Sequence, residues 1–245
     1  MRRKIVTSGK CTYCSQTFHG FSMGRHLESC KERETYLLSG IAGTPGKDSN
    51  SSNKSISDMV KTNDRVFLLQ VSSRYMPEYW LFVDANASSC KLADIDSLLR
   101  RTWLECCGHL SHFTIEDEEY ESRPDPDFGS DKDMRVALAT ILAHGMTFDY
   151  EYDYGSTTEL VLKVVAVRPG KLRRGQVMLA ARNDPISFEC MSCKKAVATD
   201  VCAVCFWEGP KATFCASCLK RHKCGEDMAL PIVNSPRTGV CGYTG

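Results

Sequence analysis

The sequence predicts an α+β fold, in which a mainly antiparallel central sheet with one or two helices is flanked by a small zinc-binding module on each side. Aromatic and acidic residues alternate over residues 148–154, apolar residues recur with helical spacing over 92–104, and cysteine pairs cluster towards both ends. The predicted organisation is a CCHC zinc finger at 1–38, a flexible linker at 39–63, an α+β domain at 64–185 and a double-zinc module at 186–245.

Composition makes the cysteines the distinctive feature. The 245 residues are 42% hydrophobic and 25% charged, with a net charge of +1, which is ordinary for a globular protein, but 14 of them are cysteine. Because no apolar run suits a signal peptide or a membrane span, we expect a cytoplasmic protein without a membrane partner. Disulfides are disfavoured in that reducing compartment, so Cys-x-x-Cys pairs indicate zinc ligands. The near-neutral charge argues against a uniform nucleic-acid-binding surface, and only residues 1–36 have a basic bias, a modest one, of the kind that attracts phosphate.

The first module has the ligand spacing of a small ββα zinc finger. A Cys-x-x-Cys turn is followed after eleven residues by His-x-x-x-Cys, which places two ligands one helical turn apart. The predicted ligands are Cys11, Cys14, His26 and Cys30. His19 lacks helical register with Cys30, so we expect it to be exposed. A single finger of this kind can contact DNA or protein.

The elements of the central domain follow from hydrophobic periodicity. The Ser/Gly/Asn-rich residues 39–63 have too few apolar side chains to pack and predict a linker. The strongest helix is expected at 92–104, with Asp94 and Asp96 early and Arg100 and Arg101 late, as the helix dipole prefers. We expect strands at 66–71, 79–83, 112–115, 148–154, 158–167 and 176–181. The acidic stretch 116–133 predicts a loop, and 134–143 favours a short helix, although a strand is possible there.

The last module holds three Cys-x-x-Cys pairs followed by a histidine and a cysteine. Eight ligands suit two zinc ions, and the gaps of eight, nine and three residues favour a cross-braced arrangement. The first and third pairs would then share one ion (Cys190, Cys193, Cys215, Cys218), and the second pair would share the other (Cys202, Cys205, His222, Cys224). Cys241 could replace His222 or Cys224, and a sequential pairing of the pairs is also open.

The other reactive side chains give no catalytic pattern. Cys90, Cys106 and Cys107 are interpreted as small buried hydrophobes, because adjacent cysteines on a helix point in different directions. The alternating acids Asp149, Glu151 and Asp153 could hold a hard cation or act as a base, but a solvated sheet face is the commoner structure. Since the sequence contains no nucleophile elbow, phosphate loop or dinucleotide motif, no catalytic or cofactor-binding residue is assigned.

Three segments of the central domain resemble the plasmid ORF-three-like family, whose members travel as passengers on insertion elements. They are residues 92–103, the His-Leu-Ser-His-Phe segment 109–113, and Phe148–Ser156, which is similar to the family's tyrosine-aspartate-aromatic-glycine motif. The resemblance covers about half of the chain and implies an α+β fold without an established activity. Residues 180–185 and 234–245 also resemble prokaryotic relatives with zinc-ribbon-like tails.

The sequence therefore predicts a non-enzymatic binding or adaptor protein that contains three zinc ions. Each predicted site has a full set of four ligands, which leaves no open catalytic position. The expected partner is a protein or a nucleic acid. The alternative is an enzyme that acts at the acidic and aromatic strand around Tyr150 and Asp153, with His109 nearby.

Overall fold

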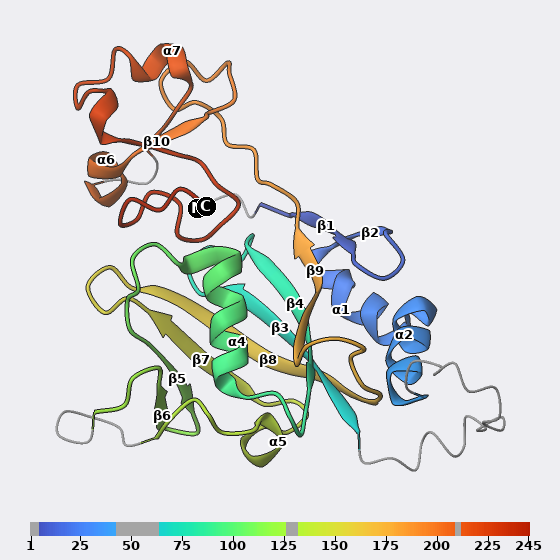
Figure 1. The fold of residues 1–245 in the computed structure, drawn as a ribbon. Helices are drawn as coiled ribbons and strands as arrows, with labels where there is room; N and C mark the ends of the chain where they lie inside the picture. Colours follow the sequence, from blue (N-terminus) through green and yellow to red (C-terminus); the bar gives the residue numbers. More distant parts are fainter. Residues whose placement is uncertain (1–4, 43–63, 126–131, 209–211) are drawn as a thin grey trace.

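The computed structural model describes residues 5–42, 64–125, 132–208 and 212–245. It confirms the α+β class: a large antiparallel sheet carries few helices, and a smaller lobe stands beside one end of the sheet (Figure 1). Most of the predicted linker, residues 43–63, lies outside the described residues. Among the helices that the structure describes, none is both long and apolar enough to cross a membrane.

Nine strands form the large sheet, and every neighbouring pair is antiparallel. Across the sheet they are β2 (Thr17–His19), β1 (Ser8–Cys11), β9 (Val177–Asn183), β4 (Trp80–Asn86), β3 (Arg65–Ser73), β8 (Thr158–Pro169), β7 (Thr147–Tyr152), β5 (Ser111–Ile115) and β6 (Glu118–Glu121). The hairpin β1–β2 of the predicted finger thus continues the sheet of the central domain, because Gly9 pairs with Asn183 and Cys11 with Ala181.

Strand β6 lies in the acidic stretch 116–133 that was predicted to be loop, and that prediction is wrong for Glu118–Glu121. Glu116 and Asp117 both have positive φ angles, of 50° and 67°, and connect β5 to β6 as a two-residue hairpin turn. Such turns favour residues that tolerate a left-handed backbone, and aspartate is one of them. Tyr120 then lies opposite Phe113 and packs against the core. Because Tyr120 is surrounded by acidic residues, the sequence shows no apolar alternation there from which a strand could be predicted.

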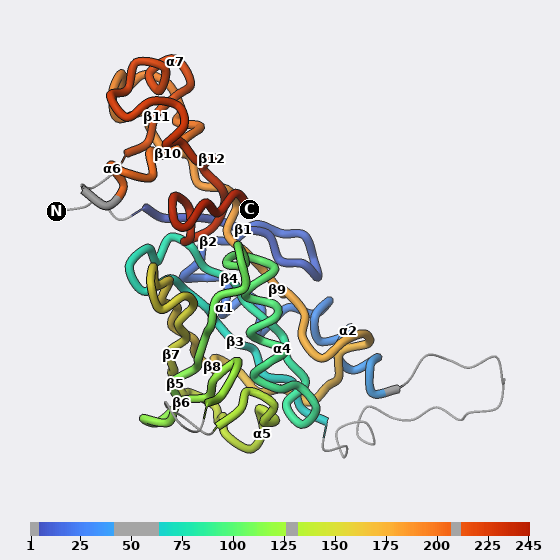
Figure 2. The backbone as a smooth tube through the Cα atoms, turned by 60° about the vertical axis from the view of Figure 1, so that its left-hand side comes forward, coloured from blue at the N-terminus to red at the C-terminus, as the bar shows by residue number. Residues whose placement is uncertain are grey.

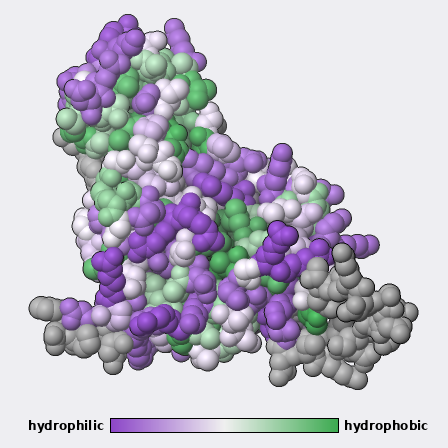
Figure 3. Space-filling view, in the orientation of Figure 1, coloured by the Kyte–Doolittle hydropathy of each residue, from purple (hydrophilic) through white to green (hydrophobic). Residues whose placement is uncertain are grey.

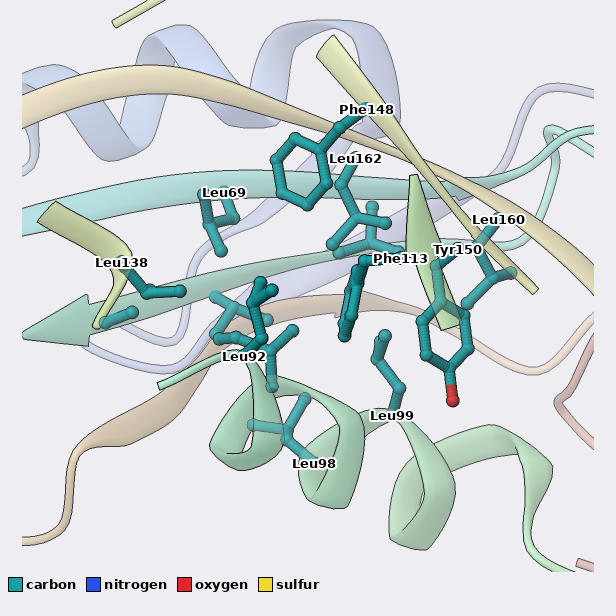
Figure 4. Packing of buried hydrophobic residues seen from close by; sticks show 14 of the residues in the cluster. Leu69, Leu92, Leu98, Leu99, Phe113, Leu138, Phe148, Tyr150, Leu160 and Leu162 are labelled. Atoms are coloured by element: carbon teal, nitrogen blue, oxygen red, sulfur yellow. The ribbon is translucent and has the colours of Figure 1, made fainter. Parts of the chain in front are cut away.

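One face of the sheet is covered by the predicted central helix. Helix α4 (Leu92–Leu99) continues into a π-helical turn, η1 (Arg100–Leu104), so the helix spans the predicted range but changes its hydrogen-bonding pattern. Its backbone begins with the Asp94 carboxylate accepting the Lys91 N–H at 2.8 Å. Leu92, Leu98 and Leu99 belong to the buried core, in which Leu99 lies next to Phe113 and Tyr150 of the sheet (Figure 4). Of the expected helix 134–143, only α5 (Leu138–Ile141) is helical.

The opposite face is covered by α1 (Gly20–Ser29) and α2 (Lys31–Ala42) (Figures 1 and 2). Met23 and Leu27 of α1 are fully buried, and they join Trp80 and Phe82 of β4 in a second core cluster. The finger helix therefore packs on the sheet through its apolar side, and its other side faces solvent.

The substitution Gly9→Ala is expected to detach this hairpin from the sheet. A Cβ at Gly9 would clash with the backbone carbonyl of Arg182 and lie 2.9 Å from the Trp80 ring, and backbone cannot move aside as a flexible side chain can. We expect a loss of stability of about 1–3 kcal/mol and faster hydrogen exchange in β1 and β9. Gly155→Ala is the matched control, since its nearest neighbour would be the Asp153 carboxylate at 3.5 Å. Equal exchange in both variants would contradict the prediction.

The smaller lobe contains short elements around a three-stranded sheet in the order β11–β10–β12. In chain order they are β10 (Asp200–Cys202), α6 (Ala203–Glu208), β11 (Thr213–Phe214), α7 (Ala216–Leu219), a 3-10 turn η2 (Glu226–Met228) and β12 (Ala229–Pro231). Its buried apolar cluster consists of Val201, Cys202 and Ala212, with partly buried neighbours. After β12 the chain returns to the large sheet, so that the end of the chain lies between the two lobes (Figures 1 and 2).

Candidate metal centres

The first candidate metal centre lies where the finger hairpin meets α1. Cys11 ends β1, Cys14 follows in the turn, His26 lies on α1, and Cys30 directly follows that helix. The four ligand atoms lie within 4.8 Å of one another. Cys11 Sγ is 4.0 Å from Cys30 Sγ, and Cys14 Sγ is 3.3 Å from His26 Nε2. His19 is exposed and contacts Ser8 Oγ instead.

These separations suit a shared tetrahedral ion. Zinc–sulfur bonds of about 2.3 Å and zinc–nitrogen bonds of about 2.0 Å place two sulfurs roughly 3.8 Å apart and a sulfur and a nitrogen roughly 3.5 Å apart. Burial raises the pKa of the Cys30 thiol to about 12. Metal binding there must therefore displace a proton, and acid weakens it.

The smaller lobe holds two clusters in the cross-braced arrangement. The first of the two consists of Cys190, Cys193, Cys215 and Cys218, and the second of Cys202, Cys205, His222 and Cys224. In each cluster the four ligand atoms lie within 4.8 Å of one another. In the second set Cys205 Sγ is 3.4 Å from His222 Nε2 and 3.7 Å from Cys224 Sγ. The structure thus brings together each set of four side chains that the spacing predicted.

Backbone geometry in the first of these clusters favours the thiolate form that binds metal. The turn after Cys190 is closed by the Lys194 N–H, which donates to the Cys190 carbonyl at 2.9 Å, with Lys194 at a φ of 52°. The backbone N–H of Cys193 lowers the pKa of the Cys190 thiol to about 6. Amide groups that point at a sulfur stabilise its negative charge, as in zinc knuckles.

Cys241 belongs to neither of these clusters. It lies beside Cys107 and His109 of the central domain, and together with Cys106 these residues form a fourth group of converging ligand atoms. The interpretation of Cys107 as a buried hydrophobe is wrong, since it is exposed; Cys106 is only half-buried, and Cys90 is buried as expected. Cys106 and Cys107 follow the end of η1, in a bend where adjacent side chains are not held to helical directions. In the described chain, four Cys/His clusters could therefore hold metal ions.

The acidic and aromatic strand does not present its side chains together. Tyr150 is fully buried in the core (Figure 4), and its hydroxyl donates to Asp96 at 2.7 Å. Asp149 lies on the opposite face and pairs with Arg74. Asp153 has a φ of 69°, which takes it out of the alternation, and its carboxylate accepts a 2.6 Å hydrogen bond from Arg237. His109 Nδ1 lies 3.4 Å from the same carboxylate.

Comparisons with known proteins give a distant structural similarity but no significant sequence match. No family model matches it, and no curated protein gives a significant sequence match. Among solved structures, it is similar to a protein of unknown function from Methanosarcina mazei Go1, with 15% identity and a TM-score of 0.42. That similarity covers 50% of this chain and 71% of the other.

Proposed function

We propose that this chain is a zinc-binding adaptor, in which zinc at Cys11/Cys14/His26/Cys30 and at the two clusters of the smaller lobe stabilises surfaces that bind a protein or a nucleic acid. The observation that carries the proposal is the completeness of the ligand sets. Each of the three clusters offers four converging ligand atoms, and a zinc ion with four protein ligands has no open position for a substrate. Thiolate-rich sets also favour zinc over hard cations.

The exposed side of α1 is the surface that we propose for partner binding. Phe21 is 78% exposed and stacks with His19, with the ring centroids 5.4 Å apart. Arg25 is exposed one turn further along the same helix. An exposed aromatic side chain beside a basic residue suits an interface anchor or a stacked base. The opposite side of α1 is occupied by the sheet, so this face alone is available.

The surface in Figure 3 gives a weaker argument for partner binding than the exposed side of α1 does. On the face seen in Figure 3, hydrophobic residues form separate small areas among hydrophilic ones, on both the sheet domain and the smaller lobe. Small scattered apolar areas of this kind are normal on soluble surfaces.

Replacing Phe21 should separate binding from folding. We expect Phe21→Ala to weaken partner binding by roughly 10-fold or more, as loss of an interface anchor does, and to leave the zinc content unchanged. The partner class is established first on the zinc-loaded full chain, by filter binding with nucleic acid over a range of salt concentrations and by crosslinking with proteins. Tyr75→Ala, which removes another exposed aromatic ring, is the matched control. If neither assay finds a partner, the adaptor proposal is wrong.

An enzyme that acts around Tyr150 and Asp153 is the weaker alternative. The Tyr150 hydroxyl is engaged with Asp96 and the Asp153 carboxylate with Arg237, so neither group is free to accept a substrate proton in this arrangement. Membership of the plasmid ORF-three-like family and a cytoplasmic location belong to the same proposal. The motif residues 148–156 support the family. The number of cysteines that we propose to be reduced metal ligands supports the cytoplasmic location.

A further inference from the structure

The cluster of Cys106, Cys107, His109 and Cys241 joins two distant parts of the chain. Its four ligand atoms lie within 4.8 Å of one another, as they do in the other three clusters. Cys241 Sγ lies 3.3 Å from His109 Nε2 and 3.9 Å from Cys107 Sγ, and the Cys106 and Cys107 sulfurs are 3.6 Å apart. The sulfur–sulfur distances are close to the roughly 3.8 Å expected between ligands of one tetrahedral zinc ion. His109 Nε2, at 2.9 Å from Cys107 Sγ and 3.3 Å from Cys241 Sγ, lies nearer to the sulfurs than the roughly 3.5 Å expected around a bound ion.

The second ring nitrogen of His109 faces a carboxylate, which orients the imidazole toward the cluster. While Nε2 faces the sulfurs of Cys107 and Cys241, Nδ1 faces the Asp153 carboxylate at 3.4 Å. Metal-binding histidines characteristically direct their second nitrogen to a carboxylate, which fixes the ring and raises its basicity. Asp153 is itself held in place, because its carboxylate accepts from the Gly155 N–H at 3.0 Å and from Arg237. A chance meeting of surface side chains would not supply this second layer of partners.

Cys241 lies in the segment after β12, residues 232–245, which we call the C-terminal tail. Other residues of this tail hold Asp153 in place behind His109. Arg237 is fully buried, and its guanidinium donates to Asp153 at 2.6 Å and to Thr158 Oγ1 at 3.0 Å. It also lies 4.8 Å from the centre of the Tyr152 ring. Two residues earlier, Ser235 donates to the carbonyl of Trp103 at 2.6 Å. The tail is thus anchored in the central domain just before Cys241 reaches the cluster.

We propose that Cys106, Cys107, His109 and Cys241 bind a fourth zinc ion, which fastens the C-terminal tail to the central domain. This site is independent of the adaptor function and of the three clusters discussed above. Three of its ligands come from the segment after η1 and one from the tail, so the metal closes a link between the sheet and the segment that leads from the smaller lobe. Loss of this metal would free the residues around Cys241, beyond the anchor at Arg237, without unfolding either lobe.

The first test uses the wild-type chain, reduced and loaded with zinc, and then freed of reductant. Cys107 and Cys241 are both exposed, so a thiol reagent should reach them unless a metal holds them. We expect iodoacetamide to alkylate both roughly 10-fold or more slowly in the zinc-loaded protein than after chelation, because coordinated thiolate is a poor nucleophile. Mass spectrometry of the peptides reads this out, with buried Cys90 as the internal control. Rapid alkylation of Cys107 and Cys241 in the loaded protein would overturn the proposal, as would a disulfide between them.

The second test counts zinc in a variant. The wild type should bind four zinc ions, one for each cluster, and Cys241→Ser should lose one of them, while hydrogen exchange rises in the tail and stays unchanged in β3. Cys90→Ser is the matched control and should bind as much zinc as the wild type. Equal zinc content in Cys241→Ser and the wild type would exclude the site. Because partner binding through α1 is measured separately, failure of this test leaves the adaptor proposal standing.

Discussion

Removal of zinc is expected to unfold the smaller lobe and leave strands β3 to β9 of the large sheet folded. The lobe buries only a small apolar cluster around Val201, Cys202 and Ala212, and its strands are two or three residues long. Metal ligation must therefore supply most of its folding free energy, on the order of 10 kcal/mol per structural zinc. The sheet has its own large core around α4, which contains no ligand of the three clusters used in the adaptor proposal.

Hydrogen exchange with and without a chelator measures this difference. Amides of β10 and β12 should lose nearly all protection in the metal-free protein, whereas those of β3 and β4 should keep theirs. Cys218→Ser should reproduce the effect in the presence of zinc, because a buried ligand is lost. Cys90→Ala also removes a buried thiol, but one outside every cluster, and should leave β10 protected. Protection of the lobe without metal would contradict the expectation.

Arg33→Ala should give the largest loss of stability of any single substitution between the finger helices and the sheet. The Arg33 guanidinium and the Asp84 carboxylate are 3% and 0% exposed, with Nε at 2.9 Å and Nη2 at 2.5 Å from the carboxylate oxygens. Tyr13 donates a further bond to the same carboxylate at 2.6 Å. Without the arginine, Asp84 would be a buried charge with one remaining partner, which typically costs about 3–5 kcal/mol.

Chemical denaturation followed by tryptophan fluorescence can measure this loss, since Trp80 lies in the same core cluster as the finger helix. Asp84→Ala should have a similar effect, and the double variant should lose clearly less than the sum of the two, because removing both partners leaves no unpaired charge. Arg25→Ala, an exposed arginine of α1, is the control and should change stability by less than about 0.5 kcal/mol. Additive losses in the double variant would show that the two side chains do not stabilise each other.

Features encoded locally could be predicted from the sequence. The alternation at Phe148–Tyr152 predicted β7, and the apolar spacing from Leu92 predicted α4 and η1, because one buried face imposes its period on the residues that form it. The cysteine pairs predicted which side chains would meet, since two ligands separated by two residues already belong to one turn. In each case the information lay within about ten residues.

Features that depend on distant segments could not be predicted in this way. Cys241 meets Cys107 across 134 positions, so no spacing rule connects them, and the preceding helix suggested that Cys106 and Cys107 point apart. The short strand β1 has no clear alternation, and its pairing with β9 depends on the shape of the sheet edge. The only signal for the fourth cluster in the sequence was the Cys-Cys-Gly-His run at residues 106–109. This run forms a four-ligand set only when the tail brings Cys241 beside it.

The strand order also has a kinetic consequence. Hairpins β3–β4, β5–β6 and β7–β8 join neighbours in the chain, but β3 must find β8, and β1 must find β9 with Gly9 opposite Asn183. Closing such long loops precedes any gain from the contacts they make, which slows folding to about milliseconds or seconds. The first cluster, whose ligands span only Cys11 to Cys30, can bind its metal well before that. We expect the finger to be a preformed piece that docks on the sheet late, as the edge of β9 becomes available.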